Sequence, residues 1–405
     1  MKSIDRRQTG QARLTPLTRA VAAILTTLAL APATTMAATS IKVGMVTTLS
    51  GPNGVPGVEV RDGWNLALKH LGGKLGGLPA TTIIRDDQFS PDTGKQVAER
   101  LLRQDRVDFM TGIIFSNILL AVAPAVFEVP IPYISANAGP SQLSGKDCSP
   151  WFASAAWQND GYHEAAGKYA SDRGFKSVFL VAPNYPAGRD ALTGFKRFYK
   201  GSIADEVYPR LGQLDFAAEL AQIRAARPDV VYNFMPGGMG INFVKQFVAA
   251  GLSKDVQLLA PGFSADEDII RAVGEPMLGL FNSAHWAHDI DNAQNRRFVA
   301  DFEADYQRIP SGYAAQGYDS ALMIDAIVRQ VKGRIEDREA LKRAMRTVRF
   351  NSLRGEFAIA SNGFPIQDYF LRVIGRDAKG RITNKTIGTI FTRHADPYAA
   401  ECRLK

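Results

Sequence analysis

Short apolar segments alternate with amphipathic segments along most of the chain, beginning near residue 41. Residues 41–49 are mainly apolar over the length of a strand, and residues 58–71 carry apolar side chains at helical spacing. We predict further strands at 81–86, 109–114, 132–135, 177–181 and 230–234, and further helices at 90–105, 119–127, 191–199 and 216–226. Strands that alternate with helices in this way predict an α/β fold, with parallel sheets covered by helices on both faces.

The alternation occurs in two runs, before and after about Trp157, and therefore predicts two sheets. Residues 295–333 then have the pattern of two long helices. Three late segments, 357–360, 369–374 and 386–391, have the pattern of strands that could pair at the edge of either sheet. With 405 residues, of which 46% are hydrophobic and 22% charged, the chain is long enough for two lobes of a water-soluble protein.

Residues 1–37 have the pattern of a cleaved secretory signal peptide. Five Lys or Arg residues precede an apolar run over 21–31, and small residues over 34–38 place the cleavage after Ala37. A membrane anchor is the alternative, but the apolar run is about half of the roughly 20 residues that a bilayer span needs. We therefore expect export to the periplasm.

Removal of this leader changes the charge balance. The leader carries five cations and one Asp, a net of +4 out of the formal +8, and leaves +4 on the remaining chain. No dense Lys/Arg run with interleaved aromatic residues occurs, so a nucleic-acid partner is disfavoured. The two cysteines, Cys148 and Cys402, would meet an oxidising compartment, where we expect one disulfide; two free thiols are the alternative. We expect no metal and no cofactor.

Ligands of open parallel sheets bind at the loops that follow the strands. The first such loop, Ser50–Gly57, has glycines spaced as in some phosphate-binding loops, but Pro52 and Pro56 each remove a backbone donor and no Gly-Lys-Ser/Thr follows. We interpret it as a stiff wall of a ligand cleft or as a tight turn. The loops over 111–117 and 133–140 contain small and hydroxyl residues suited to an anion such as a carboxylate. Ser116 could bind that anion or cap the helix that follows.

The candidates for catalysis form no known pattern. Ser154, Asp160 and His163 could be written as a triad, but no nucleophile elbow and no zinc-protease motif occurs. Asp86 and Asp87 end a strand, where adjacent side chains face opposite sides. We therefore expect a protein that is not an enzyme.

Several segments together resemble the branched-chain amino-acid type of periplasmic substrate-binding protein, the receptors that deliver ligands to ABC importers. The resemblance rests on Ile41-Lys-Val-Gly44, Leu49-Ser-Gly-Pro52, Gly112-x-x-x-Ser116, Pro132-Tyr-Ile-Ser135, residues 215–229 and Ala314-Ala-Gln-Gly-Tyr-Asp319. It implies two Rossmann-like lobes with parallel central sheets joined by a three-stranded hinge, with crossings near Trp157, Trp286 and Gly355. The implied lobes are 41–157 with 287–355, and 158–286 with 356–390, followed by a tail over 391–405. It also implies a small-molecule carboxylate and a membrane permease as partners, and we expect a monomer.

The resemblance also implies a ligand site. The carboxylate of an amino acid would meet Ser116 and backbone groups of Asn137, Ala138 and Gly139, while Tyr185 would close over the ligand from the second lobe. The place of the acidic residue that pairs with the ammonium group is taken by Gly262.

This departure favours a ligand with a carboxylate and no amine, because a buried ammonium without a partner is costly. Phe263, His285 and Trp286 could then surround an aromatic ring. Two sequence motifs resemble those of the family branch associated with aromatic acids, namely Gly237-Gly-Met-Gly240 and Ala284-His-Trp-Ala-His288. Hinge packing is the alternative for Trp286, and Asp266 or Glu267 could replace the missing acid. Amino-acid binding and a soluble sensor for a signalling or chemotaxis receptor are the alternative functions.

Overall fold

Two open sheets organise the protein in the computed structural model, which describes residues 38–404. The predicted signal peptide at 1–37 lies outside the described residues. Within 38–404, no helix is long and apolar enough to cross a membrane.

The first sheet has the strand order β2-β3-β1-β4-β5-β6, and we call it, with its helices, the N-lobe. Its strands are β1 (Ile41–Thr47), β2 (Lys74–Leu75), β3 (Leu78–Asp86), β4 (Phe109–Gly112), β5 (Tyr133–Ser135) and β6 (Phe152–Ser154). All neighbours pair in parallel except β2 and β3. Its helices are α1 (Val55–His70), α2 (Pro91–Arg100), α3 (Ser116–Glu128), α4 (Ser141–Ser144), α10 (Ala293–Tyr306), α11 (Gly312–Gln330) and α12 (Arg338–Thr347).

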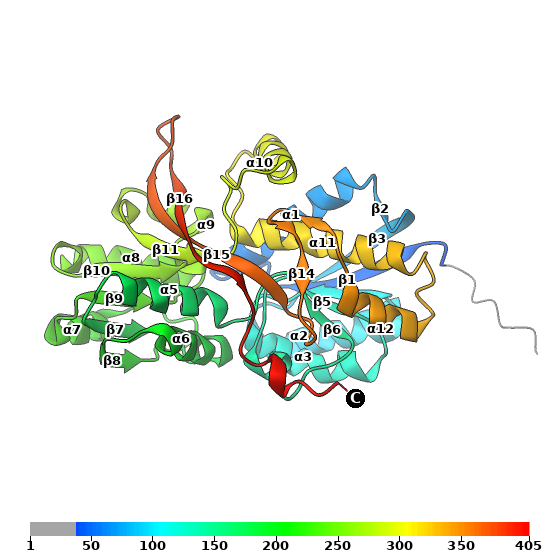
Figure 1. The fold of residues 1–405 in the computed structure, drawn as a ribbon, viewed down its shortest axis with the longest axis horizontal. Coiled ribbons are helices and arrows are strands. Elements are labelled where there is room, and N and C mark those ends of the chain that lie inside the picture. Colours follow the sequence, from blue (N-terminus) through cyan, green and yellow to red (C-terminus); the bar gives the residue numbers. More distant parts are fainter. Residues whose placement is uncertain (1–37, 405) are drawn as a thin grey trace, which may run out of the picture. The chain divides into compact units, whose positions relative to one another are not determined.

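The second sheet has the order β14-β15-β11-β10-β9-β7-β8, with β16 paired to β15, and forms the C-lobe. Its strands are β7 (Ser177–Val181), β8 (Ser202–Val207), β9 (Val230–Asn233), β10 (Gln257–Pro261), β11 (Phe281–Ala284), β14 (Ala358–Ile359), β15 (Pro365–Arg376) and β16 (Ile382–His394). Its helices are α5 (Gly161–Asp172), α6 (Pro186–Phe198), α7 (Ala217–Ala226), α8 (Gly238–Ala249) and α9 (Glu267–Val273). Figure 1 shows β15 and β16 as a long hairpin.

The three strands predicted late in the chain all join the C-lobe sheet. The sequence had not indicated which of the two sheets they would join. Strand β15 pairs antiparallel with β11, and β14 and β16 pair with β15. Most side chains of β15 alternate between buried and partly exposed positions, as expected for a strand with one covered face. The hairpin therefore closes one edge of the C-lobe sheet.

The chain passes between the two sheets three times. It leaves the N-lobe between β6 and α5, returns between β11 and α10, and leaves again between the short pair β12 (Asn351–Ser352) and β13 (Gly355–Glu356) and strand β14. This topology confirms the predicted α/β fold class. The residue boundaries predicted for the lobes stay a prediction.

Helices α1 and α11 lie in close contact on the N-lobe sheet (Figure 1). A Cβ atom on Gly63 would lie 1.9 Å from the carbonyl oxygen of Ala314, and one on Gly317 would lie 2.0 Å from that of Val60. Only glycine permits this approach, because any side chain would collide with the backbone of the other helix. The contact fixes the first turn of α11, which carries Tyr313.

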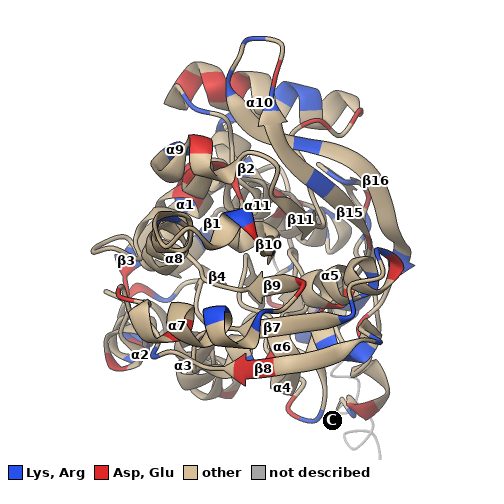
Figure 2. Ribbon diagram, turned by 90° about the vertical axis from the view of Figure 1, so that its left-hand side faces the viewer, with Lys and Arg blue, Asp and Glu red and all other residues tan. Residues whose placement is uncertain are grey.

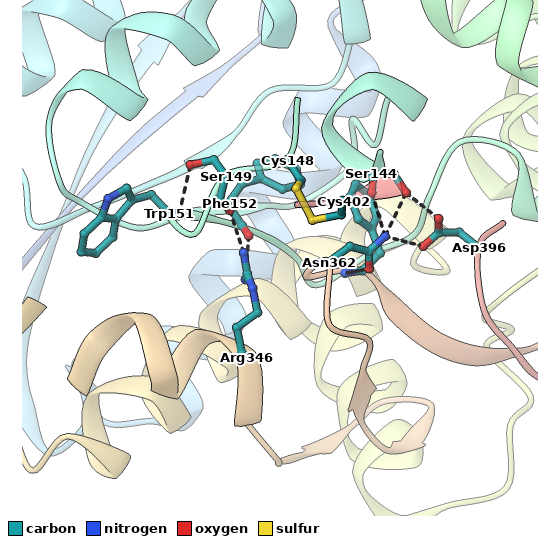
Figure 3. The surroundings of a disulfide bond; sticks show 10 residues. Ser144, Cys148, Ser149, Trp151, Phe152, Arg346, Asn362, Asp396 and Cys402 are labelled. Atoms are coloured by element: carbon teal, nitrogen blue, oxygen red, sulfur yellow. Dashed lines mark hydrogen bonds between the residues drawn. A yellow bond between two sulfur atoms is a disulfide. The ribbon is translucent and has the colours of Figure 1, made fainter. Parts of the chain in front are cut away.

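A disulfide ties the C-terminal segment back to the N-lobe (Figure 3). Cys148 and Cys402 are joined, with Cα atoms 5.6 Å apart and a sequence separation of 254. Beside it, Asn362 Nδ2 donates to Asp396 at 2.9 Å, and Ser144 also donates to Asp396. The predicted pairing is thus present, and it holds the segment that follows β16 against the N-lobe.

Candidate functional site

A cavity lies where loops from both lobes meet. It is narrow: the volume open to the centre of a water-sized sphere is about 10 Å³, enough for about one water molecule. The lining residues are Ile114, Phe115, Ser116, Asn137 and Tyr313 from the N-lobe, Trp157 and Asn159 from the first crossing, and Tyr185, Ala187, Pro236, Phe234 and Phe263 from the C-lobe. Most of them directly follow the carboxyl ends of β4, β5, β9 and β10, as open parallel sheets predict.

Six of the lining residues are aromatic. The rings of Trp157 and Phe263 have their centroids 4.5 Å apart, and those of Phe263 and Tyr313 are 5.1 Å apart. Across the C-lobe side, Tyr185 stacks on Phe234 at 6.3 Å. Aromatic side chains offer flat apolar faces that pack well on another ring. The cavity walls are therefore suited to a small planar ligand.

Ser116 brings a hydroxyl group and a helix N-terminus to this cavity. Helix α3 begins at Ser116, and its N-cap is Phe115, which makes no side-chain capping bond. Ser116 Oγ accepts a hydrogen bond from Asn159 Nδ2 at 3.1 Å, and no backbone amide of α3 donates to it in the described residues. The first amides of α3, those of Ser116 and Asn117, donate to no acceptor within residues 38–404. Free amides at a helix N-terminus favour an anion.

Asn159 holds the serine in place. Its Nδ2 also donates to Asp190 Oδ2 at 2.9 Å, and its Oδ1 accepts from the Gly139 amide at 3.0 Å. Asp190 in turn accepts from the backbone and the hydroxyl of Ser141. Burial raises the pKa of the Asp190 carboxyl. The Ser116 hydroxyl oxygen is therefore held by a network that spans α3, the first crossing and α6.

Asn137 is the third polar side chain of the lining. Its Nδ2 donates to the Ile114 carbonyl at 2.8 Å, and its own carbonyl accepts from Trp157 Nε1 at 2.6 Å. Its Oδ1 has no partner in the described part of the chain. Burial also raises the pKa of the Tyr185 and Tyr313 phenols, so both stay protonated near neutral pH. The polar groups of the lining are thus all uncharged.

A model of the periplasmic binding protein family matches residues 40–380. The chain belongs to this family. Among curated relatives, Leu/Ile/Val-binding protein homolog 6 of Brucella melitensis is 28% identical over 366 residues, 88% of this chain and 93% of the relative.

Solved structures similar to the chain include solute-binding proteins of ABC transporters. One from R. palustris, in complex with benzoate, is 30% identical with a TM-score of 0.85, and the match covers 90% of this chain and 100% of that one. Another, from Rhodopseudomonas palustris BisB5 in complex with 3,4-dihydroxybenzoic acid, is 27% identical with a TM-score of 0.83. The match covers 89% of this chain and 99% of that one. The chain is therefore a solute-binding protein of the ABC-transporter type.

Four of the nine predicted site residues line the cavity of this periplasmic binding protein, namely Ser116, Asn137, Tyr185 and Phe263. Ala138 and Gly139 are next to it, but their amides already donate to the Ile113 carbonyl and to Asn159 Oδ1. The structure therefore does not leave those two amides free for a carboxylate. The first amides of α3 are the free donors instead.

Gly262, His285 and Trp286 do not line the cavity. His285 Nδ1 contacts the Tyr162 hydroxyl. Trp286 donates to Asn295 Oδ1 at 2.8 Å and packs edge-on against Phe298, which agrees with hinge packing.

Side chains of other residues pack against Gly262, the position that the acidic residue would take. A Cβ on Gly262 would lie 3.1 Å from Arg372 Nη2 and 3.1 Å from the Tyr162 ring. Arg372 is buried, with Nε bonded to Asn282 and Nη1 to the Trp286 carbonyl. A guanidinium group thus lies next to the position where the resemblance implied an acidic residue.

Neither acid considered as a substitute is available. Asp266 accepts from the Gly312 amide and lies 3.5 Å from Arg372 Nη1, while Glu267 accepts from Thr383 and Asn384. Neither lines the cavity. No Asp, Glu, Lys or Arg is among the lining residues.

Sequence reasoning missed Asn159, Phe234 and Tyr313 as site residues. Phe234 lies at the end of a predicted strand, which was the available signal for that residue. Tyr313 lies inside the segment 295–333, for which the sequence predicted two helices without a boundary between them, so nothing marked it as lying at a helix start. Trp157 was predicted only to mark the first crossing between the lobes, and not to contact a ligand. Nothing in the sequence near Asn159 indicated its partners, because they come from α3 and α6.

The loop Ser50–Gly57 lies at the boundary of the lobes and is not among the lining residues. A Cβ on Gly238 would lie 3.1 Å from the Pro52 carbonyl oxygen, so the loop faces the start of α8.

The triad considered for catalysis is not assembled. His163 contacts the Tyr232 hydroxyl, and Ser154 Oγ donates to the Trp157 carbonyl at 3.1 Å. Asp160 pairs with Arg197 at 2.8 Å.

Proposed function

We propose that this periplasmic binding protein captures a small aromatic carboxylate in the cavity between its lobes and delivers it to the permease of an ABC importer. The observation that carries the proposal is the composition of the lining, which combines six aromatic side chains with uncharged hydrogen-bonding groups and no acid. The benzoate and 3,4-dihydroxybenzoic acid complexes of similar solute-binding proteins support the same ligand class.

The two ends of such a ligand have different partners. The carboxylate would accept from the Ser116 hydroxyl and the free amides of α3, where the helix dipole favours negative charge. The ring would pack between the Trp157–Phe263 and Tyr185–Phe234 pairs. No part of a benzoate-like molecule then needs a charged side chain.

An amino acid would leave its ammonium group without a carboxylate partner in this lining. Burying an unpaired charge costs several kcal/mol in effective terms. Arg372 stands beside Gly262 and pairs with Asp266, so this position offers no free carboxylate for an ammonium group. We therefore place branched-chain amino acids second, although curated relatives carry Leu/Ile/Val-binding names.

A thermal-shift screen with calorimetric follow-up tests the proposal. Benzoate and hydroxybenzoates at a hundred times their dissociation constants should stabilise the protein by about 2.7 kcal/mol. Leucine, isoleucine and valine should give little shift at the same concentrations. A larger shift with these amino acids than with any aromatic acid would reject the aromatic-acid proposal.

A further inference from the structure

Helix α9 of the C-lobe contacts two helices of the N-lobe. Asp266, the N-cap of α9, accepts a hydrogen bond from the amide of Gly312, the first residue of α11. Further along α9, which lies beside α1 in Figure 2, Arg271 Nη2 is 3.2 Å from Glu59 Oε1. Because both contacts join one lobe to the other, they form only when the lobes are closed.

The carboxyl group of Asp268 is buried at this boundary between the lobes. Asp268 and Arg271 are three residues apart in α9, so their side chains share a face of the helix. The pair between Arg271 and Glu59 shows that this face is turned toward α1. Asp268 is 4% exposed, and neither of its carboxylate oxygens has a hydrogen-bond partner among residues 38–404.

The neighbouring acids, in contrast, have partners. These are Arg308 and Arg271 for Glu59, Arg308 for Asp62, Arg372 for Asp266, and Thr383 with Asn384 for Glu267. Other charged residues on the elements that pack against α9 are exposed, namely Lys245 of α8, Lys385 of β16 and Glu275 in the turn after α9. Asp268 therefore differs from the acids around it in being buried without a partner in the described part of the chain.

An ionised Asp268 would oppose closure of the lobes, because a buried charge without a partner is costly and the group is neutralised instead. Burial, followed by the negative charges of Asp266 and Glu59, raises the pKa of the Asp268 carboxyl, and Arg271 opposes this shift. Glu59 belongs to the N-lobe, as does Tyr313, whose own pKa is raised by burial and then by the charge of Asp268. The neutral form of Asp268 is thus favoured in part by groups of the opposite lobe.

A ligand can enter only when the contacts between the lobes are broken. The cavity has room for about one water molecule, so the lobes must separate before a larger molecule is admitted. Separation moves α1 and α11 away from α9 and admits water to Asp268. The pKa of the carboxyl group then returns toward the ordinary value of an aspartate, about 3.9.

We infer that Asp268 takes up a proton from solvent when the lobes close on a ligand and releases it when they open. Ligand binding is then coupled to proton uptake, and the affinity falls as the pH rises. Between the pKa of Asp268 in the open protein and its higher pKa in the closed protein, each pH unit should lower the association constant by up to about tenfold. This inference goes beyond the proposed function, because it depends on lobe closure and not on the class of ligand.

Calorimetry on the wild-type protein provides the first test. Benzoate is titrated at pH 6, 7 and 8, each time in two buffers with different ionisation enthalpies, and the difference in observed enthalpy gives the number of protons taken up. At one or more of these pH values the protein should take up at least about half a proton, and the affinity should fall with rising pH. No uptake and a constant affinity at all three would overturn the inference.

Leucine replaces benzoate as the probe if benzoate does not bind. The proposed aromatic ligand would then be rejected, while the coupling between closure and proton uptake would still be tested. The two proposals therefore fail separately.

Asp268→Asn provides the second test, because the variant cannot ionise at this position. It should take up no proton on binding, and its affinity should stay constant from pH 6 to pH 8. If this variant does not fold, Asp268→Ser, which also cannot ionise, takes its place.

Glu267→Gln is the matched control. Glu267 is a buried acid next to Asp268, but its partners Thr383 and Asn384 belong to its own lobe, so closure leaves their contacts unchanged. The control should take up protons as the wild type does. Uptake that persists in Asp268→Asn, or that is lost equally in both variants, would assign the proton to another group and overturn the inference.

A measurement without ligand decides the question if neither probe binds. The described chain has no free cysteine, so spin labels can be attached at Val55→Cys and Leu278→Cys, which are exposed positions at the start of α1 and after α9. The distance between the labels should lengthen from pH 5 to pH 8, and should not change when Asp268→Asn is added. Equal distances at both pH values without the Asp268 change would overturn the inference.

Discussion

Asn159 Nδ2 donates a hydrogen bond to Ser116 Oγ at 3.1 Å, and this bond joins the first crossing to the start of α3. Because the oxygen already accepts from Asn159, the hydroxyl proton of Ser116 is directed away from that side chain. No acceptor within the described residues takes this proton. The Ser116 hydroxyl is thus available to donate a hydrogen bond at the cavity.

Ser116→Ala should weaken the binding of aromatic carboxylates about ten- to a hundredfold. The change removes one hydrogen bond to a charged group, worth about 1.5–3 kcal/mol. Titration calorimetry measures the loss. Ser320→Ala is a suitable control, because Ser320 is buried in α11 and donates to the Gln316 carbonyl at 2.8 Å, outside the lining. Equal affinities for wild type and Ser116→Ala would show that the hydroxyl does not contact the ligand.

Trp157 should report ligand binding through its fluorescence. It is one of four tryptophans, and Trp64, Trp151 and Trp286 are not lining residues. A ligand ring that packs on the indole changes its surroundings, so the emission should change on titration with an aromatic acid. Trp157→Phe should abolish most of this signal, whereas Trp151→Phe should retain it. A full signal in Trp157→Phe would place the ligand elsewhere.

Asp268 should make the protein less stable as the pH rises. Neither carboxylate oxygen has a hydrogen-bond partner in the described part of the chain, and burial, followed by the charges of Asp266 and Glu59, raises its pKa well above the usual value. Arg271 opposes this shift and also pairs with Glu59 across the lobes, where α9 lies beside α1 (Figure 2). The folded protein keeps this proton at pH values where the unfolded chain has lost it, so stability falls above about pH 4, up to the pKa of the folded state.

Asp268→Asn keeps the shape of the side chain and removes its ionisation. It should therefore raise the melting temperature by a few degrees at pH 8 and change it little at pH 4, because Asn has no proton whose retention costs stability as the pH rises. Asp266→Asn is the contrasting variant. It weakens the pair with the buried Arg372 and should lower stability at pH 8. A lower melting temperature for Asp268→Asn at pH 8 would show that the Asp268 carboxylate is stabilising.

Loss of the Cys148–Cys402 disulfide should destabilise the protein. The bond closes a loop of 254 residues, for which the chain-entropy model gives a contribution of about 5 kcal/mol, often reduced in practice. Thermal unfolding of Cys402→Ser, or of the reduced wild type, should show the loss. Thiol titration of the unfolded, unreduced protein should find no free sulfhydryl, and two thiols per chain would contradict the pairing.

Much of the fold follows from local patterns in the sequence. Strands such as β1 and β7, with one or both faces buried, show continuous apolar runs, and the helices between them show apolar residues at helical spacing. Edge strand β8 was missed, and its side chains are mostly exposed and give no such signal. The largely buried strands β10 and β11 were not predicted either. Ser116 was predicted because loops that follow parallel strands are where ligands bind, and Tyr185 because its place resembles that of an aromatic residue in the family.

The sequence by itself thus determined the two alternating α/β runs, the candidate disulfide pair and the loops that carry part of the candidate site. Tertiary structure alone decided which side chains meet in it. Asn159 reaches Ser116 only through the first crossing, and Arg372 reaches Gly262 only because β15 pairs with β11. Local periodicity reports which face of an element is buried, whereas these contacts depend on strand order and on the path of the crossings, which join residues far apart in the chain.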